Sequence, residues 1–111
     1  MQSKLMAEIT PLTLSTPAEI GRELGARLRA QRLAQELTQD ELARRAGLSG
    51  STIKALESKG QASLGSLLHV VLALGLADEL QGLFVLKLQS IAQMERAERA
   101  QRQRAPRRPR R

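Results

Sequence analysis

The sequence of 111 residues contains no cysteine, a single histidine and a single aromatic residue, Phe84. Without thiolates, a zinc cage, a redox pair and a disulfide framework are excluded, and we expect no metal or cofactor site. With one aromatic ring, the base stacking used by RNA-binding sheets and single-strand grooves has no support. His69 lies in an apolar stretch and is expected to be a core or boundary residue. No catalytic set remains, so we expect no enzyme.

Long apolar runs are also lacking. None approaches the roughly 20 residues needed to span a bilayer, and residues 1–10 lack the basic-then-apolar layout of a signal peptide. We therefore expect a soluble, cytoplasmic protein. The length suits one compact domain with tails rather than two cores.

The positive charge is concentrated at one end of the chain. The net charge of +7 arises from 18 Lys plus Arg against 11 Asp plus Glu, and residues 96–111 alone hold 8 Arg and 1 Glu. The other residues are balanced, with 10 basic against 10 acidic side chains. Because Pro106 and Pro109 break any helix there, we expect residues 101–111 to form a disordered Arg-rich tail that can contact phosphates.

Capping signals divide the rest of the chain into helices. Residues 1–15 contain too little periodicity for a helix and form a leader. Thr16, Pro17 and Glu19 then match an N-cap, a first-turn proline and a capping box, which predicts a helix to about Ala34. Its arginines lie mostly away from the apolar stripe, which consists of Ile20, Leu24 and Leu28.

The next segment predicts two helices that meet across a tight turn. Thr38 and Glu41 form a second capping box, Gly47 suits a left-handed helix end, and Ser49 caps a helix to about Ser58. Residues 39–56 therefore have the layout of a helix-turn-helix motif. Its apolar and small positions are Leu42, Ala43, Ala46, Gly47, Leu48, Ile53 and Leu56.

Two more helices complete an all-α domain of five helices over residues 16–84. The stretch from Leu64 to Leu74 is so rich in leucine and valine that it should be central, and a brief helix follows near 78–84. Residues 85–88 read either as continued helix or as a short strand. Residues 85–100 form a candidate dimerisation or partner segment, or fold back on the domain, and from Ser90 onward the composition favours helix.

Three stretches of the sequence resemble one family of DNA-binding domains. ELGARLRAQR, LTQDELARRAGLSGSTIKALES and SLGSLLHVVLALGL are similar to the lambda-repressor and Cro type of helix-turn-helix found in XRE-family regulators. The segment ASLGSLLHVVLALGLADELQGLF with a basic tail most resembles HipB-like antitoxins. That resemblance implies a dimeric repressor that binds its own operator and holds a HipA-like kinase toxin inactive.

The resemblance also assigns roles by position. Gln39 would bond a phosphate and support the base-reading helix. Apart from the resemblance, Arg44 and Lys59 are basic side chains that either contact backbone phosphates or are simply solvated. The exposed start of the recognition helix is formed by Ser49, Gly50, Ser51, Thr52 and Lys54. Gly50 and Ala55 stand where relatives present longer polar side chains, so DNA shape or the tail should contribute more to binding. Glu36 replaces a usual glycine, at a cost of about 1 kcal/mol if it must be left-handed.

These features predict a sequence-specific, double-stranded DNA-binding regulator, with two recognition helices about 34 Å apart in a dimer. Two alternatives remain. One is a stand-alone phage-type or housekeeping repressor without a toxin. The other is a helix-turn-helix scaffold that serves as a protein-interaction or RNA-binding adaptor, with the Arg-rich tail supplying nonspecific affinity.

Overall fold

The computed structural model describes Leu12 and residues 15–104. It divides into two compact units, residues 1–81 and 82–111, which are treated separately below. Within the described residues all regular structure is helical, as the sequence predicts. The predicted leader lies outside the described residues apart from Leu12 and Ser15, and the tail lies outside them from residue 105 onward.

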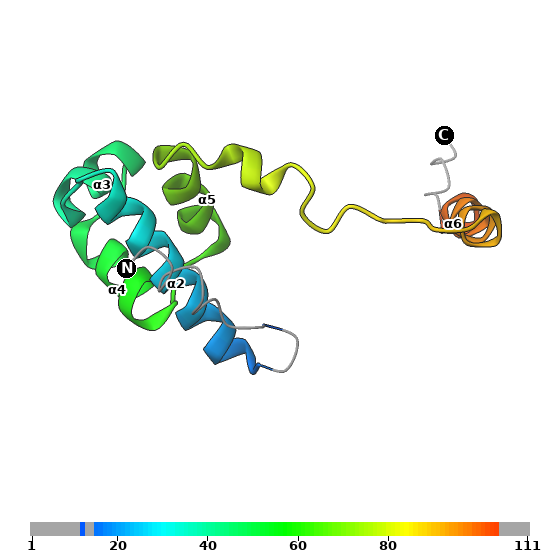
Figure 1. Cartoon of the computed structure of the whole chain (residues 1–111), viewed down its shortest axis with the longest axis horizontal. Helices are drawn as coiled ribbons and strands as arrows, with labels where there is room; N and C mark the ends of the chain where they lie inside the picture. Colours follow the sequence, from blue (N-terminus) through cyan, green and yellow to red (C-terminus); the bar gives the residue numbers. More distant parts are fainter. Residues whose placement is uncertain (1–11, 13–14, 105–111) are drawn as a thin grey trace, which may run out of the picture. The chain divides into compact units, whose positions relative to one another are not determined.

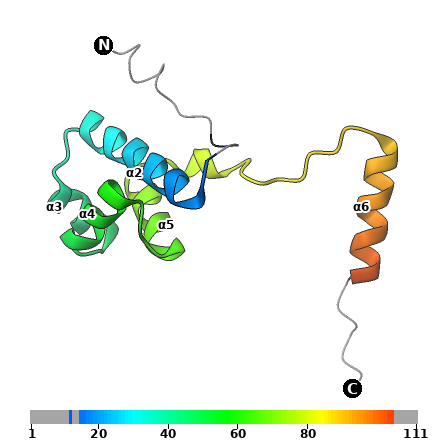
Figure 2. The same cartoon turned by 90° about the horizontal axis from the view of Figure 1, so that it is seen from below.

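Among the residues that the structure describes, the first unit contains four α-helices and a short 3₁₀ helix (Figures 1 and 2). The helices begin where the capping signals place them, since Thr16, Thr38, Ser49 and Ser63 each accept a hydrogen bond from a first-turn N–H. Their bounds are α2 Pro17–Ala34, α3 Gln39–Ala46, α4 Gly50–Lys59, α5 Leu64–Ala73 and η1 Ala77–Leu80.

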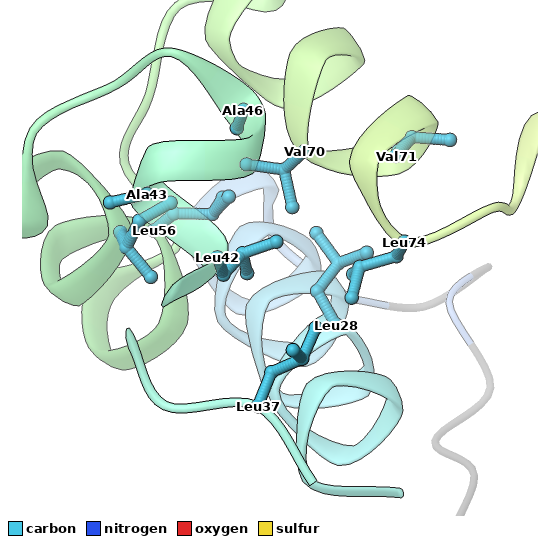
Figure 3. Packing of buried hydrophobic residues seen from close by; sticks show 10 residues of the cluster. Leu28, Leu37, Leu42, Ala43, Ala46, Leu56, Val70, Val71 and Leu74 are labelled. Atoms are coloured by element: carbon cyan, nitrogen blue, oxygen red, sulfur yellow. The ribbon is translucent and has the colours of Figure 1, made fainter. Parts of the chain in front are cut away.

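The core lies between α2, α3, α4 and α5. Leu42 and Ile53 are completely buried and Val70 is nearly so, and Figure 3 shows Leu42, Leu28 and Val70 directed into the same interior. α3 packs against both α4 and α5, while α2 packs against α4. The predicted motif positions are confirmed: they supply Leu42, Ala43, Ala46, Ile53 and Leu56 to the core, with Leu48 packed against it.

Backbone contact between α2 and the end of α4 is unusually close. A Cβ built on Gly25 would stand 2.1 Å from the Leu56 carbonyl oxygen, and one on Gly60 would meet the backbone of Gly21 at the same distance. Gly60 also has φ +67°, a left-handed conformation that side chains rarely adopt. Glycine at these positions therefore lets the two helices pack backbone to backbone.

The expectation that residues 64–74 form a central helix is wrong in part. α5 buries Val70, Val71 and Leu74, whereas Leu64 and Leu72 are 70% and 58% exposed. His69 is also exposed rather than in the core or at its boundary. An apolar residue count cannot reveal this, because burial depends on the elements that α5 meets, and it packs mainly against α3.

The chain after α5 also departs from expectation. The brief helix predicted near 78–84 is the 3₁₀ helix η1 alone, followed by a turn in which Phe84 has φ +60°. Residues 85–89 form neither the helix nor the strand that their pattern allowed.

In the second unit, α6 Ile91–Arg104 follows Ser90, whose Oγ accepts from the Gln93 N–H at 3.1 Å. The helix was predicted only to about residue 100. Residues 101–104 therefore belong to α6, and this corrects the predicted start of the tail.

Candidate nucleic-acid interface

The turn between α3 and α4 fixes how the two helices meet. Gly47 ends α3 with φ 70° and ψ 33°, the left-handed conformation predicted for it, and Ser49 begins α4 two residues later. At the other end of α3, the Thr38 hydroxyl accepts from the Glu41 N–H and the Glu41 carboxylate accepts from the Thr38 N–H. Both ends of α3 are thus capped by local interactions, which leaves little freedom in the angle between α3 and α4.

A buried ion pair connects α2 with α4. The Arg32 guanidinium donates through Nε to Glu57 Oε2 at 2.7 Å and through Nη2 to Oε1 at 3.0 Å, and its Nη1 donates to the Leu37 carbonyl at 2.7 Å. Gln39 Nε2 donates to Glu57 Oε1 at 3.0 Å. Sequence reasoning placed Arg32 on an outward face, but a bidentate partner lets it be buried.

The shifts in pKa favour the charged forms of both Arg32 and Glu57. Burial raises the pKa of Glu57, but the hydrogen bonds from Arg32 and Gln39 and the attraction of Arg32 and Arg29 outweigh it, so the pKa is lowered. The hydrogen bond to Glu57 raises the pKa of Arg32. Through Glu57, Gln39 is linked to α4; the phosphate contact that the resemblance implied for it stays a prediction.

The outward face of α4 is the side opposite its buried residues Ile53, Leu56 and Glu57. Ser51, Lys54 and Ser58 are exposed there, one turn apart, and Ala55 beside them is half-buried. Ser58 was missed by the sequence analysis, although its spacing of four from Lys54 could have revealed it. Its Oγ donates to the Lys54 carbonyl at 2.7 Å, which leaves the oxygen's acceptor capacity facing outward.

The hydroxyls at the start of α4 are tied together. Ser49 Oγ accepts from the Thr52 N–H at 3.1 Å, and it lies 3.1 Å from Ser51 Oγ and 2.8 Å from Thr52 Oγ1. Ser49 is thus the helix cap, and Thr52 is half-buried beside it. Ser51, like Ser49, is exposed.

A polar cleft adjoins this face. It is lined by Arg29 and Arg32 of α2, Thr38 and the first two residues of α3, Gln39 and Asp40, and Lys54 of α4. Among the described residues, neither Arg29 nor Lys54 forms an ion pair. Arg29 was not among the predicted site residues, because only the packing of α2 on α4 brings it next to Lys54.

The remaining predicted residues lie around the cleft at different distances. Gly50 opens α4 against α3, where an added Cβ would stand 3.2 Å from Asp40 Oδ1. Arg44 is exposed one turn after Asp40 on the same side of α3. Lys59 is exposed in the last turn of α4, about 13 Å along the axis from Gly50, and does not line the cleft.

The comparison with protein families agrees with this geometry. A family model described as a helix-turn-helix domain matches residues 23–81, which is more than half of the chain and includes α3, the turn and α4. The chain belongs to the helix-turn-helix domain family. No curated protein matches the chain.

In this helix-turn-helix domain, α3 is the supporting helix and α4 takes the position of the recognition helix. Family membership indicates a DNA-binding regulator at this coarse level. Within the part of the chain that the structure describes, no helix is both long enough and apolar enough to cross a membrane.

Proposed function

We propose that this helix-turn-helix protein is a sequence-specific regulator of transcription that binds double-stranded DNA through α4. The observation that carries the proposal is the unpaired Lys54 ammonium, which stands on the outward face of α4 and also borders the polar cleft. A lysine at the start of a recognition helix can reach guanine acceptors in the major groove or a phosphate. The proposed activity is binding, without catalysis, in the cytoplasm and on the nucleoid.

The cleft beside α4 fits a backbone phosphate. Arg29 and Lys54 supply positive charge from two helices, and the positive dipole end of α3 borders the cleft at Gln39 and Asp40. Asp40 is the one carboxylate in this lining, and among the described residues it forms no ion pair. A phosphate seated here would set the register of α4, so Gln39 and Arg29 position the helix while Ser51, Lys54 and Ser58 face the bases.

Selection of bound duplexes from a random pool tests the proposal. Purified full-length protein would be used at roughly 150 mM salt, which suppresses binding driven by counterion release alone. We expect an enriched, two-fold symmetric motif, because a dimeric repressor reads two half-sites. Binding without any enriched motif would overturn sequence-specific regulation and favour the adaptor function, in which the scaffold binds protein or the tail binds nucleic acid nonspecifically.

Charge reversal tests whether DNA binding depends on α4 or only on the overall charge of the surface. Lys54→Glu should weaken binding to the selected duplex at least tenfold, since it places a carboxylate against DNA. Arg22→Glu makes the same change in the first half of α2, away from the cleft, and should alter affinity less than threefold. Equal losses in both variants, measured by fluorescence anisotropy of labelled duplex, would show that only overall charge matters and that α4 is not the reading helix.

A finer proposal concerns the operon. The resemblance of residues 62–84 and the basic tail to HipB-like antitoxins supports a dimeric repressor that also neutralises a HipA-like kinase toxin. The exposed leucines of α5, Leu64 and Leu72, supply apolar surface for such a protein partner. A neighbouring kinase gene whose product copurifies with the protein, and is lost with Leu72→Glu, is the expected result. With no such partner, the stand-alone repressor is the correct reading.

A further inference from the structure

The second unit exposes much more apolar surface than a short segment normally does. Phe84 is 94% exposed, and neighbouring large side chains remain partly or largely exposed as well. The set consists of Leu83, Phe84, Val85, Leu86, Leu88, Ile91 and Met94. Contiguous apolar surface of this kind marks an interaction site in a native protein.

The unit also lacks a core of its own. No residue of α6 is buried, and Ala97 alone is half-buried among its described side chains. An isolated helix of 14 residues is marginally stable in water, even when its sequence favours helix. A packing partner therefore has to supply the buried apolar contacts that the unit lacks.

Four of these seven side chains line one groove. It is lined by Leu86 and Leu88 of the irregular segment and by Ile91, Met94 and Ala97 of α6. Glu95, Glu98, Ala100 and Gln101 complete the lining. The large apolar side chains of the groove thus lie within residues 86–94, and three of the five lining residues from Glu95 onward are polar.

We infer that this groove is closed by the same groove of a second copy of the chain, with the two α6 helices antiparallel and their two-fold axis beside Met94. The inference deepens the dimer of the proposed function by assigning its interface. The arrangement is isologous, so each copy offers the same patch and receives it.

The exposed apolar area of the second unit is large enough for an interface with a second copy of the chain. The interface also includes Leu83, Phe84 and Val85, which directly precede the groove residues in the chain. Together with the four large apolar side chains of the groove, they equal about four fully exposed residues, or roughly 700 Å² at the size of leucine and phenylalanine. Stable interfaces bury about 800 Å² per partner, so pairing of the two patches with a small polar border reaches the required size.

The charge distribution selects the antiparallel orientation. The second half of α6 carries Arg99, Arg102 and Arg104, and the chain continues into further arginines. Parallel helices would place these cations side by side, and like charges repel. An antiparallel pair centred on Met94 stacks the apolar halves, directs the arginine-rich ends apart and opposes the helix dipoles.

Single-cysteine cross-linking tests both the partner and the orientation, because the chain has no cysteine of its own. Met94→Cys near the axis should form a covalent dimer on oxidation. Gln101→Cys should stay monomeric on a denaturing gel, since antiparallel packing puts the two residues about 20 Å apart. Cross-linking of both variants would overturn the antiparallel arrangement in favour of a parallel one.

Mass measurement supplies the second arm of the experiment. The wild-type chain should elute in light-scattering chromatography at twice its 12.2 kDa, and Met94→Glu should reduce this to the monomer. Arg96→Glu, on the opposite side of α6, is the matched control and should remain dimeric. A wild-type monomer that forms no Met94→Cys dimer overturns the inference. Because these measurements need no DNA, their failure is distinct from a failed duplex selection.

Discussion

Removing Arg32 tests whether the α2–α4 ion pair holds the recognition helix in place. Arg32→Met leaves the Glu57 carboxylate, which is 6% exposed, with Gln39 as its one remaining partner and leaves the buried Leu37 carbonyl without its donor. Breaking a buried pair by removing one partner costs about 3–5 kcal/mol. The free energy of unfolding of small domains is about 5–15 kcal/mol, so this variant should retain only part of its stability.

The matched control lies on the same helix. Arg27 forms an ion pair with Glu23 at 2.9 Å, four residues earlier, and its side chain is 38% exposed. Because solvent screens such a pair, Arg27→Met should cost less than about 1 kcal/mol. Both variants replace an arginine with methionine in α2, so helix propensity contributes little to the difference.

Urea unfolding followed by circular dichroism measures the effect, since the chain has no tryptophan or tyrosine for fluorescence. The double variant Arg32→Met with Glu57→Met should lose less stability than Arg32→Met alone, because no charge is then left buried without its partner. The reasoning is refuted if Arg32→Met unfolds within about 1 kcal/mol of wild type at an unchanged slope with urea.

Two further predictions concern acid stability and helix packing. The pKa of Glu57 is lowered on folding, so its stabilising contribution is complete above the ordinary pKa of 4.5 and is lost as the pH falls through the lower folded-state pKa. The double variant Arg32→Met with Glu57→Met should therefore lose less stability in acid than the wild type does. Acid titrations followed by circular dichroism measure this difference. Gly25→Ala should destabilise by about 2 kcal/mol or more in urea, because its Cβ meets the Leu56 carbonyl at 2.1 Å. Gly65→Ala, in open space within α5, should instead stabilise by about 0.5–1 kcal/mol, and equal effects of the two alanines would contradict the close packing of α2 on α4.

Local signals in the sequence predicted the helix boundaries well. The two capping boxes at Thr16 and Thr38 and the left-handed Gly47 are all present in the structure. Glu36 adopts φ 58°, the left-handed conformation that its place after the first helix implied. These features depend on residues within four positions of each other, so the sequence contains the whole interaction.

The exposed positions of some candidate site residues also follow from local sequence, whereas their role in binding stays a prediction. Ser51 and Lys54 are exposed on α4 as the helical period requires, whereas Ser49 is engaged as a cap and Lys59 lies away from the cleft. The sequence could not place Arg29, because the cleft joins residues from three helices. Periodicity within one helix gives a face but not the neighbour that the face meets.

The sequence by itself determined where α2 to α5 begin and end to within about a residue, which small and apolar residues form the helix-turn-helix, and that the excess charge lies near the C-terminus. Only the tertiary structure decided that Arg32 is buried on Glu57, that Leu64 and Leu72 of α5 stay exposed, and that Gly25 permits the close crossing of α2 and α4. Hydrogen-bonded caps are local, whereas burial depends on which distant surfaces meet, and that is fixed only when the helices pack.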